Sequence, residues 1–188
     1  TSGADRVAPA WARSGDDLNF LYTGGTTGMP KGVMWRQDDL VVKLTASLGR
    51  PIDENGTIDD LRGTFTAPGS RFLPACPQMH GTGNFPCLST LTGGGSVVTL
   101  TNRTFDPVEL LDTIEREGVN SISIVGDAFA KPILRTLDAN LGRWDLTSLV
   151  GIVSSGVMWS KESKQGLLDH HPGMVLMDAF SSSEALGM

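Results

Sequence analysis

Residues 106–125 read DPVELLDTIEREGVNSISIV, and this stretch contains both kinds of regular element that the fold needs. Asp106 is a good helix N-cap, Pro107 occupies the first helical position and Glu109 the third, so three signals agree on a helix start. Apolar residues then recur at helical spacing until Gly118, and a short apolar run after it predicts a strand. A helix followed directly by an apolar strand is one step of an alternating α/β chain.

The same alternation runs from residue 71 to the end of the chain, with predicted strands at 71–75, 96–100, 121–125, 149–153 and 174–177 and predicted helices at 82–91, 106–118, 127–137 and 160–170. Before it, the sequence predicts short strands at 18–22 and 33–35 and a helix at 38–49 with Asp38 as N-cap. Such alternation is typical of parallel βαβ units joined by right-handed crossovers. We therefore predict an α/β fold, with a mainly parallel sheet and helices on both faces.

The domain organisation follows from the remaining segments. Residues 1–15 mix small residues and proline with charges, and we expect them to lead into a single α/β domain over 16–188. Residues 50–69 carry several acids and no apolar period, which indicates an excursion at the surface. His170 and His171 precede Pro172 and are expected to cap a helix end at the surface. The chain opens without Met and stops without a polar tail, so we expect a piece of a longer protein.

The composition excludes several classes of protein. Apolar residues make up 39% and charged residues 19% of the 188 residues, which is enough for a buried core and too apolar for a disordered chain. No apolar run approaches the roughly 18 residues of a membrane span. The net charge of −6 argues against a nucleic-acid-binding surface. The two cysteines form no CxxC pair, so neither zinc nor disulfides are indicated, and a cytoplasmic protein is the default expectation.

The most informative motif follows the first predicted strand, where residues 22–32 read YTGGTTGMPKG. Glycines let several backbone N–H groups converge on phosphate oxygens, threonines add hydroxyl donors, and Lys31 adds a positive charge. A Walker A loop requires Gly-Lys followed by Ser or Thr at a helix start, whereas here Pro30 precedes Lys31 and Gly32 follows it. The sequence therefore predicts a different kind of phosphate loop, with a flexible Gly/Thr surface loop as the alternative.

This run resembles the phosphate-binding loop of the adenylate-forming superfamily, which comprises acyl-CoA synthetases, luciferases and the adenylation domains of peptide synthetases. The family usually has Ser at the position of Gly24, so one hydroxyl donor is missing here. The resemblance covers 16–188 and implies that the small C-terminal domain with the family's catalytic lysine is absent from this sequence. It implies ATP binding by Thr23, Gly24, Gly25, Thr26, Thr27, Gly28 and Lys31, with catalytic roles for Thr27 and Lys31.

Two further segments resemble the family's acyl pocket. Residues 77–83 (PQMHGTG) are similar to the segment beside the acyl and pantetheine tunnel, which implies acyl-pocket roles for His80 and Gly81. Taken alone, His80 is a histidine with a local partner, and a general base is not needed because a carboxylic acid is already ionised near neutral pH. Gly126 and Phe129 resemble the start of the acyl-pocket helix.

Residues 178–184 (DAFSSSE) resemble the family's Tyr-Gly-x-Thr-Glu segment. Phe180 keeps the aromatic face that lies against adenine, and Glu184 implies a Mg²⁺ partner, because a carboxylate facing a triphosphate needs a cation between them. A solvated glutamate at a helix start is the alternative. The implied ATP-binding residues in this half are Ser155, Gly156, Phe180, Ser181, Ser182, Ser183 and Glu184. Glu184 is also an implied catalytic residue, and Glu184 and Thr27 are the implied metal ligands.

The resemblance implies a fragment of an ATP-dependent acyl-CoA synthetase, inactive in isolation, that uses ATP, Mg²⁺, coenzyme A and a small carboxylic acid. Residues 31–36 (KGVMWR) resemble actinobacterial ligases for fatty acids or steroid side chains. Because ligands gather beyond the carboxyl ends of parallel strands, we expect all the motifs at one edge of the sheet.

Two alternatives to a CoA ligase stay open. The first is an amino-acid adenylation domain, with Asp127 as the candidate for binding the amino group, although Phe129 and the Met-rich surroundings favour an apolar acid. The second is a nucleotide-binding module without acyl chemistry. An α/β-hydrolase is excluded, because the sequence contains no Gly-x-Ser-x-Gly elbow.

Overall fold

The computed structural model describes residues 10, 12–23, 29, 31–52, 56–180 and 182–183. Its centre is a five-stranded parallel sheet with the order β4-β3-β5-β6-β7. The strands are β3 (Arg71–Pro74), β4 (Ser96–Val97), β5 (Ser121–Ile124), β6 (Gly151–Ser154) and β7 (Val175–Asp178), and the helices between them are α3 (Gly81–Thr92), α4 (Pro107–Glu117), α5 (Gly126–Ala139) and α6 (Lys161–His170). The predicted α/β class with a mainly parallel sheet is confirmed.

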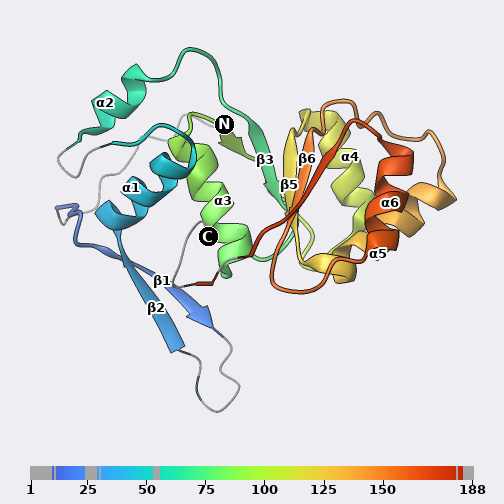
Figure 1. Ribbon diagram of the computed structural model, residues 1–188, viewed down its shortest axis with the longest axis horizontal. Coiled ribbons are helices and arrows are strands. Elements are labelled where there is room, and N and C mark those ends of the chain that lie inside the picture. Colours follow the sequence, from blue (N-terminus) through green and yellow to red (C-terminus); the bar gives the residue numbers. More distant parts are fainter. Residues whose placement is uncertain are drawn as a thin grey trace.

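Helices cover both faces of this sheet, also as predicted (Figure 1). Helix α3 packs against β3, β4 and β5 on one side, whereas α4, α5 and α6 lie on the other. The main core forms on the second side, where Ile122 and Ile152 of the strands meet Leu110 and Ile114 of α4 and Leu167 of α6. Each of these side chains is at most 1% exposed, so this layer supplies most of the hydrophobic stabilisation.

Helix α4 begins and ends where its sequence signals place it. The side chain of Asp106 accepts a hydrogen bond from the Val108 N–H at 2.9 Å, and Gly118 ends the helix with a left-handed φ of 60°. The Glu109 carboxylate leaves its own helix and accepts hydrogen bonds from the N–H groups of Thr101 and Asn102. It thereby fixes the segment after β4, which stops at Val97, so the prediction that this strand reaches residue 100 is wrong.

The first two predicted strands form a separate hairpin. Strands β1 (Leu18–Thr23) and β2 (Lys31–Arg36) pair antiparallel in a two-stranded sheet, with Thr23 opposite Lys31. The expectation that all the motifs follow the carboxyl ends of parallel strands is therefore wrong for the glycine loop, which follows β1. The physical reason is length: residues 24–30 are too few for the crossover of a dozen or more residues that parallel strands need, whereas a hairpin accommodates them.

The helices that follow the hairpin also differ from the prediction. Helix α1 (Gln37–Ser47) begins directly after β2, so Arg36 is its N-cap residue and Asp38 lies in its first turn. The stretch 50–69 contains a helix, α2 (Ile58–Gly63), that the absence of an apolar period concealed. A capping box between Thr57 and Asp60 starts this helix, and Leu61, 4% exposed, attaches it to the protein.

Candidate functional site

The turns after β3, β5, β6 and β7 lie at one edge of the sheet, because these strands are parallel. The expectation of a common edge is thus confirmed for the motifs that follow strands of the parallel sheet. Every one of these turns contains residues that the sequence singled out as candidates. Thr23 and Lys31, which flank the glycine loop, belong to the β1–β2 hairpin, and the packing of this hairpin is described below.

The turns after β6 and β7 enclose a cavity of about 430 Å³. Its lining residues are Ser154, Ser155, Gly156, Val157, Met158, Trp159, Asp178, Ala179 and Phe180. Three of the predicted ATP-binding residues, Ser155, Gly156 and Phe180, are therefore neighbours in one cavity. Phe180 is 83% exposed, so its aromatic ring is accessible to a flat base that could stack on it.

Gly126 holds the wall of this cavity in place. It adopts a left-handed φ of 51°, and a Cβ atom at this position would lie 2.5 Å from the carbonyl oxygen of Met158. Its N–H donates a hydrogen bond of 2.9 Å to the buried Ser154 hydroxyl, a residue that the sequence analysis did not single out. Only glycine fits here, so the turn after β5 sets the path of residues 154–158.

Asp127 also stabilises the contact between the turn after β5 and the segment that leads to α6. Its carboxylate accepts hydrogen bonds from the N–H and hydroxyl of Ser160, at 3.1 and 3.0 Å, and forms an ion pair with Lys131 at 3.1 Å. Burial alone would raise the pKa of Asp127, but these hydrogen bonds outweigh burial and lower the pKa to about 2. The carboxylate is thus occupied within the fold, at the start of α6, rather than presented to a ligand.

The residues expected to form an acyl pocket are not brought together. His80 is exposed at the N-terminus of α3, with Gly81 as the first helical residue, and Gly126 faces residues 157–158. Phe129 packs against Phe105, with 4.7 Å between ring centroids. It lines a second cavity of about 430 Å³, together with residues 74–78 after β3. Phe129 and the segment that leads to His80 thus share this second cavity, while Gly126 belongs to the first.

The hairpin packs on α3 through its inner face. Leu21 is buried in a small cluster with Leu40, Leu44 and Phe85, and the Asn19 amide lies 3.4 Å from the Asn84 amide oxygen. Asn84 is in the first turns of α3, the helix that His80 precedes. The hairpin is therefore attached next to residues 77–83, which resemble the family segment beside the acyl and pantetheine tunnel.

Trp35 connects the hairpin to the last motif. Its indole N–H donates a hydrogen bond of 2.8 Å to the carbonyl oxygen of Ser183, across 148 positions of sequence. Ser183 is half-buried and Ser182 is exposed. Sequence reasoning missed both Trp35 and Asn19, and the only local signal for them was a polar or donor-bearing side chain at an inward position of an apolar strand.

The two residues that flank the glycine loop, Thr23 and Lys31, lie opposite each other at the loop end of the hairpin. The Thr23 hydroxyl donates a hydrogen bond of 3.3 Å to the Lys31 carbonyl oxygen, and the Lys31 side chain is exposed. The predicted site residues outside the described part of the chain are Gly24, Gly25, Thr26, Thr27, Gly28, Ser181 and Glu184. Within the described part, no group of three or more His, Cys, Asp or Glu side chains could hold a metal ion.

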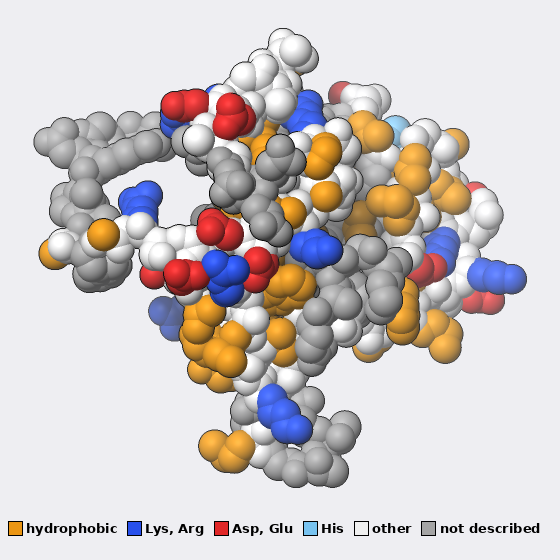
Figure 2. Space-filling view, turned by 60° about the vertical axis from the view of Figure 1, so that its left-hand side comes forward, with side chains coloured by type: hydrophobic (Ala, Val, Ile, Leu, Met, Phe, Trp, Pro, Cys, Tyr) orange, Lys and Arg blue, Asp and Glu red, His pale blue; other side chains and the backbone are white. Residues whose placement is uncertain are grey.

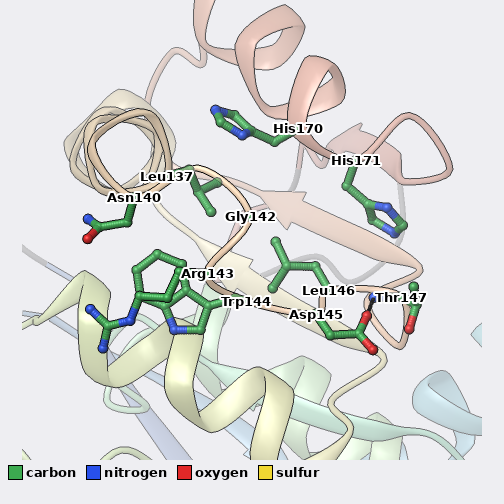
Figure 3. A pocket seen from close by; sticks show the side chains of 10 residues that line it. All are labelled: Leu137, Asn140, Gly142, Arg143, Trp144, Asp145, Leu146, Thr147, His170 and His171. Carbon is green, nitrogen blue, oxygen red and sulfur yellow. Dashed lines mark hydrogen bonds between the residues drawn. The ribbon is translucent and has the colours of Figure 1, made fainter.

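A smaller pocket of about 230 Å³ lies between the end of α5, residues 140–147 and the end of α6 (Figure 3). None of the predicted site residues lines it. His171 is the C-cap residue of α6, yet the rings of both histidines bond to other elements rather than capping their own helix: His170 pairs with Asp138 at 2.8 Å and His171 with the Leu149 carbonyl at 3.1 Å. These contacts brace α6 against its neighbours, so we assign this pocket a structural role.

Comparison with known proteins defines the class first. Residues 2–188 match the protein family described as AMP-binding enzyme, so the chain belongs to this family. Among its relatives, it is 35% identical over 175 residues to the medium-chain acyl-CoA ligase Mig of Mycobacterium avium. It is 34% identical over 180 residues to the 3-oxocholest-4-en-26-oate–CoA ligase of Rhodococcus rhodochrous. These alignments cover 90% and 92% of this chain but 31% and 32% of the relatives, so the chain spans about a third of their length.

Solved structures agree on the fold. The N-terminal domain of FACL13 from Mycobacterium tuberculosis superposes with a TM-score of 0.68 at 18% identity, covering 94% of this chain and 39% of that one. The luciferase-like enzyme of the mealworm Zophobas morio gives the same TM-score at 17% identity, with 98% and 39% coverage. Among the described residues, no helix has the length and apolar character needed to cross a membrane.

Proposed function

We propose that this chain is the nucleotide-binding part of an ATP-dependent acid–CoA ligase. The observation that carries the proposal is the position of the hairpin, which contacts α3 through Asn19 and the Ser183 segment through Trp35. This packing places the hairpin that flanks the glycine loop against the helix that follows His80 and against the segment that ends at Ser183. The names of the relatives, which are acyl-CoA ligases, support the same reaction.

In the first step, a carboxylate oxygen of the acid attacks the α-phosphorus of ATP, and the bond to pyrophosphate breaks to leave an acyl-adenylate. We assign adenine to the cavity beside Phe180, which Ser155 and Gly156 also line. Lys31, at the base of the glycine loop, offsets charge on the β- and γ-phosphates. In the second step, the thiol sulfur of coenzyme A attacks the acyl carbon, AMP leaves, and the thiol proton is released.

Magnesium is part of this proposal through two residues outside the described part of the chain. Glu184 and Thr27 would offer a carboxylate and a hydroxyl oxygen, the hard ligands that Mg²⁺ prefers. The ion would neutralise charge on the triphosphate when bound. Glu184 follows Ser183 in the sequence, and Trp35 holds the Ser183 carbonyl oxygen close to the hairpin.

For the acid, we propose a fatty acid or a steroid side-chain acid. Relatives from Mycolicibacterium smegmatis and Rhodococcus rhodochrous, 37% and 34% identical, are named as ligases for such acids. The side chain of Phe129 lines a partly apolar cavity, which suits a hydrocarbon chain. Asp127 is bound by Ser160 and Lys131, and this disfavours the alternative in which it holds the amino group of an amino acid.

The test is acid-dependent ATP–pyrophosphate exchange by the full-length protein. Dodecanoate, palmitate, a steroid acid with its carboxylate at carbon 26 of the side chain, and a mixture of amino acids would be compared at saturating ATP and Mg²⁺. We expect exchange with at least one of the apolar acids and none with amino acids. Pyrophosphate exchange with amino acids alone would establish the adenylation-domain alternative. Nucleotide binding without pyrophosphate exchange would establish the other alternative, a nucleotide-binding module without acyl chemistry.

A further inference from the structure

Trp35 makes a directional contact between two distant segments. An indole has one donor, its Nε1–H, and no acceptor, so in a partly buried position that donor needs one well-placed partner. The partner is the Ser183 carbonyl oxygen, 2.8 Å away. Because the acceptor is a main-chain atom, the contact fixes the path of the backbone after β7 rather than the orientation of a side chain.

The Trp35 ring is itself held by the core beneath the hairpin. It lies edge-to-face with Phe85, with 6.2 Å between ring centroids and 81° between ring planes. It also packs against the buried cluster that contains Leu21 and Leu40. These contacts hold the Trp35 side chain in one rotamer, so its N–H points in one direction. The segment after β7 is therefore bonded to a rigidly held donor.

Both partners of this contact lead to proposed ATP-binding residues. Lys31 and Trp35 lie four residues apart on β2, so they share one face of the strand at a separation of about 13 Å. The Ser183 carbonyl belongs to the peptide bond that continues into Glu184. One indole therefore sets the distance between the strand that carries Lys31 and the segment that leads to Glu184.

Resting on the function proposed above, we propose that Trp35 is a positioning residue for ATP. It holds Asp178–Phe180 and residues 182–183 at the spacing from the hairpin at which one nucleotide contacts both, with adenine beside Phe180 and the triphosphate beside Lys31. In this role Trp35 acts through the Ser183 backbone and touches no reacting atom. Loss of the N–H alone is expected to raise the KM for ATP about three- to tenfold, the range of one net hydrogen bond.

The experiment uses the full-length protein with Trp35→Phe and, as a second variant, benzothienylalanine at position 35, which replaces the N–H by sulfur and keeps the shape of the ring. The KM for ATP is measured by acid-dependent pyrophosphate exchange, and amide hydrogen exchange is followed in residues 178–183. Trp144→Phe is the matched control, because its indole N–H donates to Asp112 at 2.6 Å, beside the pocket at the ends of α5 and α6.

A raised KM for ATP and faster amide exchange in residues 178–183 with both position-35 variants, but not with Trp144→Phe, would support the proposal. An unchanged KM in the folded isosteric variant would overturn it, and so would an equal rise in Trp144→Phe. If the unmodified protein shows no pyrophosphate exchange with any acid, the proposed function fails instead. The dissociation constant of ATP is then measured in place of the KM, and the same criteria decide the role of Trp35.

Discussion

The turns of the parallel sheet and the β1–β2 hairpin are built in different ways. The turns after β5 and β6 are held together by main-chain hydrogen bonds, from Asp127 to Met158 and from Ser155 to Ile124, by the buried Ser154 hydroxyl and by Gly126, which no other residue can replace. Among the described residues, the hairpin packs on the rest of the domain through its inner face. Its outer face carries Leu18, Phe20, Tyr22 and Met34, which are 45–62% exposed, and hydrophobic side chains gather over the hairpin in Figure 2.

This difference separates two tasks. The side of the site proposed for adenine is fixed by the same contacts that stabilise the domain, so changes there reduce stability first. The side proposed for phosphate sits on an element with few attachments, so changes there affect nucleotide binding while the domain stays folded. The predictions below test this division, beginning with the largest expected effect.

Gly126→Ala is expected to destabilise the domain by about 2–4 kcal/mol, because the new Cβ meets the Met158 carbonyl and the left-handed φ is unfavourable for alanine. Gly142→Ala is the matched control: its φ is 70°, but nothing lies within 4 Å of the added carbon. Only the strain of about 1 kcal/mol should appear there. Urea unfolding measures both variants, and equal effects would show that the contact with residues 157–158 contributes nothing.

Leu21→Ala is expected to cost about 2–3 kcal/mol, because Leu21 is 2% exposed on the inner face of the hairpin. Phe20→Ala, on the neighbouring outer position, should cost about 0.5 kcal/mol or less, since Phe20 is 49% exposed. Thermal unfolding of the two variants measures the contrast. A large loss of stability in Phe20→Ala would mean that the outer face is covered in solution.

Lys31→Ala is expected to weaken ATP use about ten- to a hundredfold, the range of one charge-assisted contact of about 1.5–3 kcal/mol. The melting temperature should hardly change, because the side chain is exposed at the end of a strand. Thr26→Ala and Thr27→Ala should have smaller effects, since each removes a neutral donor. Pyrophosphate exchange and a melting curve are measured for each variant, with Lys43→Ala, at an exposed position, as the control. Variants that lose melting temperature while they still use ATP normally would show that the loop is structural.

Asp127→Asn is expected to lower stability at neutral pH by about 1–2 kcal/mol, through weaker hydrogen bonds with Ser160 and loss of the pair with Lys131. Because folding lowers the pKa of Asp127 to about 2 from the ordinary 3.8, its contribution is complete above about pH 4 and disappears as the pH falls towards 2. The stability difference between the two proteins should therefore shrink over that interval. A constant difference from pH 7 to pH 2 would contradict this assignment.

Local sequence signals determined a large part of this protein. The period of helix α4, its Asp106 cap and its Gly118 stop are properties of neighbouring residues, and the structure keeps all of them. Alternating strands and helices were enough for the α/β class, because a parallel strand requires a crossover before it. The motifs after β3, β5, β6 and β7 then fell at one edge for the same topological reason.

Tertiary structure alone decided how those parts meet. The hydrogen bond from Trp35 to Ser183 joins residues 148 positions apart, and nothing in either local sequence encodes the partner. The need for glycine at position 126 comes from the Met158 carbonyl, which belongs to a different turn. The expected acyl-pocket residues separated because Phe129 packs on Phe105 while Gly126 packs on residues 157–158. Local periodicity reports which face of an element is buried, whereas the identity of its neighbour depends on long-range packing, and that packing forms only when the whole domain folds.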